Sequence, residues 1–259
     1  MKGSLLALMI AAVSTGVAAN TYQNETTLNY GWGDIANTES DLDAWQLSHR
    51  FYLSPVDTSG NAPLAESAFI NKNASVFATL GRFSVDGDDQ NNWSVGGEFM
   101  SSQHNFYGSL EWTHFSNTND QQVDASLGYF ITNDWLVGAI AEHSSPDEGG
   151  STTNYGVMTK KLWDLGTGDM MNLEATVLDY RNWSTTRYGV GADYYFGKNF
   201  SAGVGYQWLS DGVFSESEDS LSLRARWFAM QNLSVQAEVA FDTLETADDL
   251  YSVGVSYRF

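Results

Sequence analysis

Hydrophobic and polar residues alternate with a period of two along most of the chain. The pattern is clearest over the last nine residues, where Tyr251, Val253, Val255, Tyr257 and Phe259 alternate with Ser252, Gly254, Ser256 and Arg258. Successive side chains of a β-strand point to opposite faces, so this pattern indicates a strand with one apolar and one polar face. We expect the apolar face to meet lipid and the polar face to meet water.

The same alternation predicts strands along the whole chain after residue 21. The predicted strands cover residues 22–33, 42–53, 74–85, 92–101, 106–116, 121–131, 135–144, 152–162, 170–181, 185–196, 199–210, 219–229, 232–242 and 249–259. Their lengths are near the roughly 9–11 residues that a tilted transmembrane strand needs, and even strand numbers are the rule for bacterial barrels. We expect an all-β fold, a transmembrane antiparallel up-and-down β-barrel of about fourteen strands; twelve or sixteen are the alternatives if two hairpins are misread.

The first nineteen residues have the order of parts of a secretory signal peptide. Lys2 supplies the positive n-region, residues 5–13 are apolar, and residues 17–19 are small, as at a cleavage site. The apolar part is well under the roughly 20 residues of a spanning helix, which disfavours a membrane anchor. We expect a signal peptide over 1–19 and an outer-membrane β-barrel over 20–259, exported through the periplasm of a Gram-negative bacterium.

Composition supports this class and excludes others. The chain has 32 Asp and Glu against 12 Lys and Arg, a formal charge of −20, which argues against binding to nucleic acid phosphates. It has no cysteine, so disulfides are excluded, and a closed hydrogen-bonded barrel is another source of stability. Twenty-four glycines, 14% aromatic residues and only three prolines fit outer-membrane strands.

The connections between strands alternate in character, which orients the barrel. With both termini in the periplasm, short polar turns lie at the periplasmic end and longer acidic segments lie at the exterior end. The exterior acids are Asp34, Glu39, Asp41, Asp86, Asp88, Asp89, Asp120, Asp147, Glu148, Asp211, Glu216, Glu218, Asp219, Asp242, Glu245, Asp248 and Asp249. Their potential enriches cations at the mouth, so we expect a weak cation preference; the alternative is that they only keep the surface soluble or bind divalent ions.

The alternation also assigns charged residues to the inner face of the barrel. An arginine that faces lipid at the midplane costs about 2–4 kcal/mol, so these side chains should face water. The predicted pore-lining residues are Arg50, Arg82, Glu98, Glu111, Asp124, Glu142, Glu174, Arg187, Asp193, Arg224, Arg226, Glu238 and Arg258. Glycine and serine fill most other inner positions, and fourteen strands enclose more space than eight, which predicts a water-filled lumen. A lumen closed by ion pairs, with Arg224 and Arg226 bound to acids on adjacent strands, is the alternative.

Two segments carry a resemblance to known outer-membrane proteins. Phe259, with Tyr257 two residues before it, resembles the carboxy-terminal signature that the barrel assembly machinery reads. Residues 53–77, LSPVDTSGNAPLAESAFINKNASVF, are similar to a segment of the general porin family of Gram-negative outer-membrane β-barrels. The resemblance implies a pore-forming outer-membrane protein and transfers no functional residue. The same connection carries a helix-prone run that begins at Pro63, a favourable position for proline.

These observations favour a porin, a passive channel for small hydrophilic solutes and ions, over two other hypotheses. His114 and Ser116 lie in a sequence similar to the His-x-Ser-Asn cluster of outer-membrane phospholipases and lipid A deacylases, where the imidazole would activate the hydroxyl. A closed structural barrel is the third reading, although most connections look too short to plug the lumen. We expect no metal site and no cofactor. Outer-membrane lipid and lipopolysaccharide are the expected partners, with a monomer slightly favoured.

Overall fold

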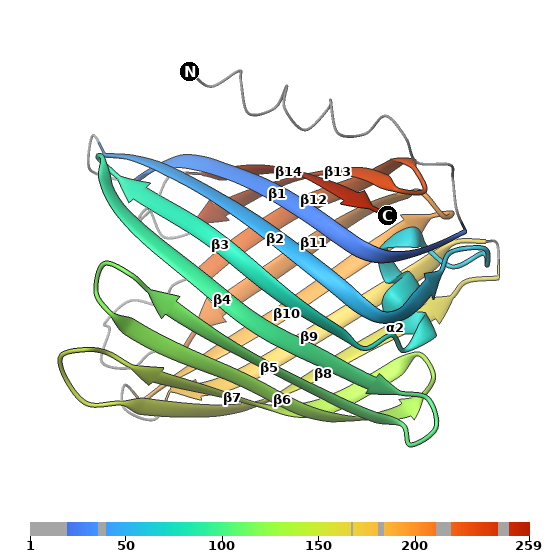
Figure 1. Cartoon of the computed structure of the whole chain (residues 1–259), viewed down its shortest axis with the longest axis horizontal. Helices are drawn as coiled ribbons and strands as arrows, with labels where there is room; N and C mark the ends of the chain where they lie inside the picture. The colour runs from blue at the N-terminus through green and yellow to red at the C-terminus, as the bar shows by residue number, and fades with distance from the viewer. Residues whose placement is uncertain (1–19, 36–39, 167, 181–183, 211–218, 243–248) are drawn as a thin grey trace.

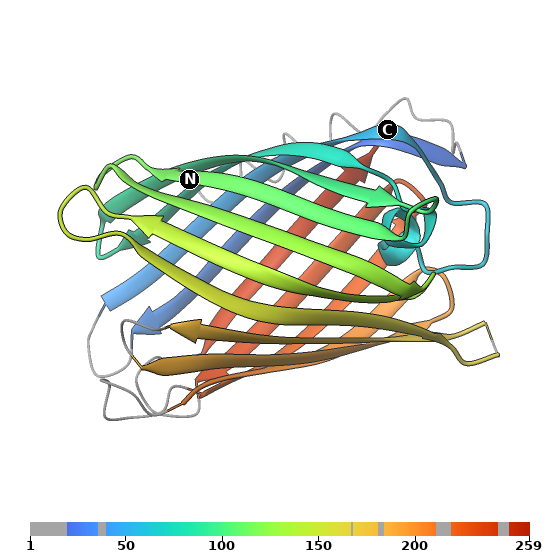
Figure 2. The same ribbon diagram turned by 90° about the horizontal axis from the view of Figure 1, so that it is seen from below.

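The strands form a closed barrel in which every strand pairs with its neighbours in sequence. In the computed structural model, residues 20–35, 40–166, 168–180, 184–210, 219–242 and 249–259 are described. All strand pairs are antiparallel, and the first strand pairs with the last (Figures 1 and 2). The fold is therefore a closed up-and-down β-barrel. The predicted signal peptide at 1–19 lies outside the described residues.

Fourteen strands are present in the part of the chain that the structure describes, as the alternation predicts. They are β1 (Thr21–Ile35), β2 (Ser40–Asp57), β3 (Ser75–Val85), β4 (Asp88–Ser101), β5 (Phe106–Phe115), β6 (Asp120–Thr132), β7 (Trp135–Ser145), β8 (Thr152–Asp164), β9 (Met170–Tyr180), β10 (Thr185–Phe196), β11 (Phe200–Leu209), β12 (Asp219–Met230), β13 (Leu233–Asp242) and β14 (Leu250–Arg258). The predicted strand number is confirmed. The largest differences at strand ends are in two strands. β2 runs to Asp57 because Val56 and Asp57 still pair with the start of β1, and β4 begins at Asp88, which pairs with Val85.

The barrel closes between β1 and β14. The register runs from Glu25 opposite Arg258 to Trp32 opposite Tyr251. The backbone amides of Gln23 and Asn24 donate to the carbonyl oxygen of Phe259 at 3.1 and 2.9 Å. Both described ends of the chain therefore lie at the same end of the barrel, which we call the periplasmic end.

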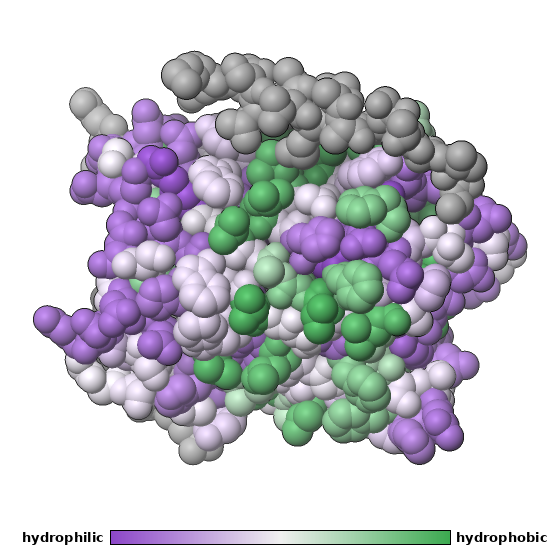
Figure 3. Space-filling model, in the orientation of Figure 1, coloured by the Kyte–Doolittle hydropathy of each residue, from purple (hydrophilic) through white to green (hydrophobic). Residues whose placement is uncertain are grey.

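The outer face of the barrel carries a belt of hydrophobic side chains. Leu110, Leu127 and Val157 lie at strand centres and are 57%, 63% and 58% exposed. Figure 3 shows hydrophobic residues in a central belt and hydrophilic residues gathered toward the two ends. Apolar exposure of this extent fits lipid contact, since a transmembrane barrel presents such a band to the bilayer.

Aromatic rings gather at both edges of this belt. Trp32 stacks on Tyr251 at 5.9 Å, and Tyr188 stacks on Trp208 at 4.8 Å, near the exterior ends of their strands. At the opposite edge, Tyr257 stacks on Phe259 at 5.8 Å, among other aromatic pairs. Amphipathic rings prefer the boundary between hydrocarbon and headgroups, so the two aromatic edges mark the membrane interfaces.

The connection between β2 and β3 folds back into the barrel. It contains a 3₁₀ turn, η2 (Leu64–Glu66), followed by a short helix, α2 (Ser67–Asn71), in the helix-prone run that begins at Pro63. Figures 1 and 2 show this helical segment inside the ring of strands at the periplasmic end. This connection is longer than a hairpin turn and enters the lumen, where apolar residues on the inner face of the strands give it a surface to pack on.

Candidate pore lumen

Twelve of the thirteen predicted pore-lining residues lie on the inner face of the barrel. Directly opposed residues on paired strands share a face, so the register assigns each side chain. Glu111, Asp124 and Glu142 oppose one another in one row across β5, β6 and β7. The neighbouring outward row, Leu110 and Ala125, belongs to the lipid-facing belt. The row therefore places three carboxylates side by side on the lumen wall.

Arg82 is the exception, and its assignment to the lumen is wrong. It opposes Trp45 on β2 and lies two residues from Leu80, which is an exposed lipid-facing side chain. Its guanidinium pairs with Asp89 on the outer surface. The assignment failed because charge was taken as a sign of the inner face, whereas Arg82 lies next to the exterior turn, where a charged group can reach headgroups at little cost.

A cysteine-labelling experiment tests this assignment of faces. The chain has no cysteine, so Arg82→Cys and Asp124→Cys each introduce a single thiol. A bulky, membrane-impermeant thiol reagent is expected to lower the ion conductance of the Asp124→Cys barrel, because the adduct stands in the lumen. The same reagent should leave the conductance of Arg82→Cys unchanged. Equal reductions in both variants would contradict the register.

Most lumen charges are paired. Arg50 bonds to Glu98 at 3.0 Å, Arg187 to Glu142 at 2.8 Å and Arg258 to Glu25 at 2.7 Å. Lys160 reaches Glu66 at 3.0 Å and Glu174 at 2.8 Å. The first three pairs stand apart on the wall, whereas Asn172 donates to both Glu174 and Asp193 and so connects Lys160 to the next acid along the wall. Polar cavities remain beside these pairs.

One ion pair is bidentate and reaches past a glycine on the strand between its two partners. Arg224 on β12 donates from Nε and an Nη nitrogen to the two carboxylate oxygens of Asp193 on β10, both at 2.7 Å. Gly203 on the intervening β11 opposes both residues, and a Cβ there would lie 2.1 Å from the Asp193 carboxylate. The absence of a side chain at this position lets the bidentate pair span two strand intervals. Arg224 therefore pairs with an acid one strand beyond its neighbour, and Arg226 pairs with no carboxylate among the described residues.

The periplasmic end of the lumen is narrowed by residues Pro63–Lys72, which we call the periplasmic plug (Figure 1). Pro63 and Leu64 are fully buried. The helix α2 places Ala68 against a cluster formed by Tyr22, Tyr52 and Val56. On its other side, Phe69 packs against a second cluster, in which Phe130 lies 5.5 Å from its ring centre. The plug is thus held by apolar burial on two parts of the inner wall.

Polar contacts fix the plug as well. Glu66 is 7% exposed, bonds to Lys160 and accepts a hydrogen bond from the Tyr195 hydroxyl at 2.5 Å. Arg258 donates to the carbonyl oxygen of Leu64 at 2.9 Å. A buried carboxylate needs partners of this kind, because its desolvation costs several kcal/mol. The plug is therefore joined to β8, β10 and β14.

Lys72 closes the plug at its carboxyl end and lies in the connection outside the spanning strands. Its ammonium donates to the carbonyl oxygens of Phe69 and Asn133 at 2.9 and 2.5 Å and lies 3.7 Å from the ring centre of Phe130. Burial lowers the pKa of Lys72 from 10.5 to about 8. The folded barrel therefore releases this proton at a lower pH than the unfolded chain does.

The pKa shift predicts a pH-dependent stability. Between about pH 8 and pH 10.5 the unfolded chain holds a proton on Lys72 that the folded barrel lacks, so stability rises with pH across this window and is constant in this respect below it. Urea unfolding in lipid vesicles should show the wild type gaining stability relative to Lys72→Met from pH 8 to pH 10.5. A difference between the two proteins that stays constant over this range would contradict the burial of the ammonium.

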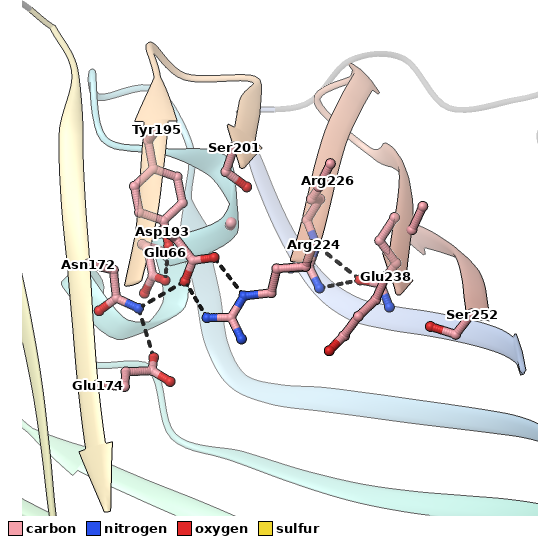
Figure 4. Close-up of a pocket in the computed structure, with 14 residues that line it drawn as sticks. Glu66, Asn172, Glu174, Asp193, Tyr195, Ser201, Arg224, Arg226, Glu238 and Ser252 are labelled. Atoms are coloured by element: carbon pink, nitrogen blue, oxygen red, sulfur yellow. Dashed lines mark hydrogen bonds and ion pairs between the residues drawn. The ribbon is translucent and has the colours of Figure 1, made fainter. Parts of the chain in front are cut away.

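A polar cavity lies in the lumen next to the plug, on the side away from the periplasmic end (Figure 4). It has a volume of about 290 Å³, and Ala65 and Glu66 of the plug form part of its wall. The remaining charged lining residues are Glu174, Asp193, Arg224, Arg226 and Glu238. A second cavity of about 360 Å³ shares Glu174, Arg224 and Glu238 with the first and extends along glycines and serines of β10–β12. The lumen is therefore hollow and polar above the plug.

The sequence pattern missed several residues of this lumen. Lys160 lies inside and Lys161 outside, so the consecutive lysines hid the alternation; Lys161 instead pairs with Asp134 at 2.7 Å at the periplasmic interface. Glu66 was missed because it belongs to the plug. Glu25 faces inward opposite Arg258, as the alternation of β1 would have indicated.

The two residues of the hydrolase hypothesis, His114 and Ser116, lie at the exterior end of β5. His114 lies beside Trp93 and Trp112, with ring centres at 5.9 and 6.2 Å. Ser116 follows the end of β5, and its backbone amide donates to Asn91. No hydrogen bond joins the imidazole to the Ser116 hydroxyl in the described part of the chain. The arrangement is that of an aromatic cluster at the exterior membrane edge.

The ranges described contain no group of three or more His, Cys, Asp or Glu side chains placed to hold a metal ion. They also contain no helix long and apolar enough to cross a membrane.

A closed fourteen-stranded barrel with a lipid-facing belt and a polar, charged lumen defines an outer-membrane β-barrel of the porin class. A family model described as "Putative general bacterial porin" matches residues 3–150 and 145–259, and the chain belongs to this family. The protein is therefore located in the outer membrane of a Gram-negative bacterium. Family and fold point to a channel rather than to an enzyme.

The fold is shared with a solved outer-membrane protein, and two further solved structures named below resemble the chain more distantly. The outer membrane protein Omp33 of Acinetobacter baumannii superimposes with a TM-score of 0.74 at 18% identity, covering 93% of this chain and 99% of that chain. A bacterial polysaccharide outer membrane secretin has a TM-score of 0.49 at 14% identity, covering 94% and 100%. The KdgM porin has a TM-score of 0.46 at 14% identity, covering 90% and 99%. No curated protein matches the sequence.

Proposed function

We propose that the protein is a passive diffusion channel for small hydrophilic solutes and ions. The observation that carries this proposal is the hollow polar lumen above the plug, with its two adjoining cavities. Small inner residues such as Gly189 and Gly205 leave this space open. The plug narrows the periplasmic end, so the channel passes only small molecules.

Liposome swelling tests this proposal. Vesicles containing the refolded mature barrel should swell in glycerol and in small sugars at rates that fall steeply with solute size. Vesicles with a folded barrel, shown by heat-modifiable gel mobility, that do not swell in glycerol would overturn the proposal. Empty vesicles give the baseline for lipid permeability.

We also propose a weak preference for cations. Glu111, Asp124 and Glu238 face the lumen without a cationic partner among the described residues, whereas Arg226 is the one lumen arginine without a carboxylate partner there. The described exterior acids Asp41, Asp86 and Asp147 add negative potential at the mouth, while residues 36–39, 211–218 and 243–248 lie outside the described residues. Fixed charges of one sign enrich the opposite ion. The reversal potential under a salt gradient should favour cations and should move toward zero in Glu111→Gln/Asp124→Gln; a preference for anions would refute this.

The plug gives a second candidate function some support. A barrel whose plug stays in place could be a closed structural anchor, because Pro63 and Leu64 are fully buried in the periplasmic end. The cavities above the plug favour the channel, since a closed anchor has no need of a hollow, polar interior.

We also propose how the protein is exported and assembled into the outer membrane. We propose that residues 1–19 are removed as a signal peptide after export to the periplasm. Tyr257 and Phe259 lie on the outer face of β14, beside the seam with β1, where the barrel assembly machinery would recognise them. We propose a monomer surrounded by lipid and, on the exterior side, by lipopolysaccharide.

A further inference from the structure

The cavity next to the plug contains one cation and one anion that have no partner of opposite charge among the described residues. Arg226 and Glu238 both line it, on the neighbouring strands β12 and β13. The other charged residues that line the cavity form ion pairs. Arg224 is paired with Asp193, and Glu66 and Glu174 are both paired with Lys160. Figure 4 shows Arg226, Glu238 and Ser252 together on one side of the cavity, away from Asp193 and Asn172.

Arg226 is held in place without losing its charge. Its guanidinium donates to the side-chain oxygen of Gln236, with Nε at 3.0 Å. Gln236 in turn donates to the Asn29 side chain at 2.7 Å. A guanidinium has five N–H donors in a planar fork that suits a carboxylate, and the neutral Gln236 uses only part of them. Arg226 is therefore positioned to bind an anionic group.

Glu238 offers the complementary charge. Its carboxylate is exposed to the cavity and has no hydrogen bond or ion pair with the described residues. It opposes Arg224 across the β12–β13 pair, but the Nε and an Nη of Arg224 are directed at Asp193. An ionised carboxylate accepts only, so an ammonium group is a fitting partner.

We propose that this cavity is a binding site for small zwitterions that carry both a carboxylate and an ammonium group, such as amino acids. This proposal rests on the proposed function, because the ligand enters through the lumen. Arg226 and Glu238 are diagonal neighbours on one face of an antiparallel pair, where the backbone separation is about 7–8 Å. A small molecule with both charges bridges this spacing. The hydroxyl of Ser252 supplies a further polar contact.

The same arrangement disfavours other solutes. A simple anion is attracted by Arg226 but repelled by Glu238. A simple cation is attracted by Glu238 but repelled by Arg226. The aromatic side chain of the cavity, Tyr195, has its hydroxyl bound to Glu66 and is buried, so it offers no open face on which a sugar could stack. The volume of about 290 Å³ lies just below the roughly 300–1,000 Å³ of ligand pockets. The cavity thus fits a small amino acid.

The test uses four probes on the refolded mature barrel in proteoliposomes. L-alanine carries both charges, propionate and propylammonium carry one each, and glycerol is uncharged. Alanine uptake is expected to saturate, with weak competition from propionate and from propylammonium, whereas glycerol flux rises linearly with concentration. In Arg226→Gln and in Glu238→Gln the concentration that gives half-maximal alanine uptake should rise about tenfold, the effect of losing about 1.4 kcal/mol.

Arg187→Gln is the matched control, since it removes a lumen arginine outside this cavity and should leave alanine uptake saturable. Glycerol flux, unchanged in all variants, shows that each barrel is folded and open. Alanine uptake that does not saturate in the wild type, or that is equal in the wild type and both cavity variants, overturns the proposal. If glycerol fails to enter through the wild type, the proposed function is wrong. The binding site is then tested separately by calorimetry of alanine binding to the barrel in micelles. Binding that Arg226→Gln abolishes supports the site, and a wild type that shows no binding overturns it.

Discussion

Replacing the periplasmic plug with a short turn should raise the single-channel conductance of the barrel several-fold. Residues Pro63–Lys72 narrow the periplasmic end of the lumen, where Phe69 packs against Phe130 and Glu66 bonds to Lys160. Barrels of this strand number have room for more than their own side chains. A Gly–Ser turn in place of the plug leaves an aqueous path from the polar cavities to the periplasm. The measurement is the ion current through single refolded barrels in a planar bilayer.

The control changes the same connection outside the barrel. Ser59 and Asn61 are exposed and precede the plug, so Ser59→Gly/Asn61→Gly alters the connection without emptying the lumen. Its conductance should equal that of the wild type. Equal conductances for the wild type and the plug replacement would show that the narrowest point lies elsewhere in the channel.

Arg258→Ala should lower the free energy of unfolding by about 3–5 kcal/mol, the usual effect of removing one partner of a buried ion pair. Arg258 is 4% exposed, bonds to Glu25 at 2.7 Å and donates to the Leu64 carbonyl of the plug. Its guanidinium also lies 4.6 Å from the ring centre of Tyr22. The substitution removes the ion pair of Glu25, because the arginine opposite it on β2, Arg50, is bonded to Glu98. Urea unfolding in lipid vesicles measures the change.

Two variants make this result specific. Arg82→Ala breaks an exposed ion pair with Asp89 on the outer surface and should cost no more than about 1 kcal/mol. Glu25→Gln combined with Arg258→Ala should recover part of the lost stability, because no unpaired buried charge remains. Similar losses for Arg82→Ala and Arg258→Ala would contradict the difference in burial on which the prediction depends.

The fold follows from the sequence because lipid and water act on every residue of a strand in turn. Positions such as Leu223 and Val253 had to face lipid and Arg224 had to face water, so alternation alone predicted about fourteen strands and the face of most residues. It failed at Arg82, where headgroups tolerate charge, and at Lys160–Lys161, where both faces carry lysine. Near the ends of the strands, lipid headgroups tolerate charged side chains almost as well as the lumen does. Charge therefore does not show which face of the strand a residue occupies there.

The contents of the lumen could not be predicted in the same way. The plug is held by contacts between residues far apart in the chain, such as Glu66 with Tyr195 and Leu64 with Arg258. The pair of Arg224 with Asp193 depends on Gly203 between them, which the alternation alone does not distinguish from other inner glycines. Periodicity gives the direction of a side chain, whereas partners across the lumen depend on the closed three-dimensional register.

The central claim is that the lumen conducts, and single-channel recording of the wild-type mature barrel tests it most directly. The protein is refolded, its folding is confirmed by heat-modifiable gel mobility, and it is added to a planar bilayer in symmetric salt. Discrete, stable current steps, smaller than those of the plug replacement, are the predicted result. A silent bilayer with correctly folded wild-type protein would contradict the channel and would favour the closed structural barrel.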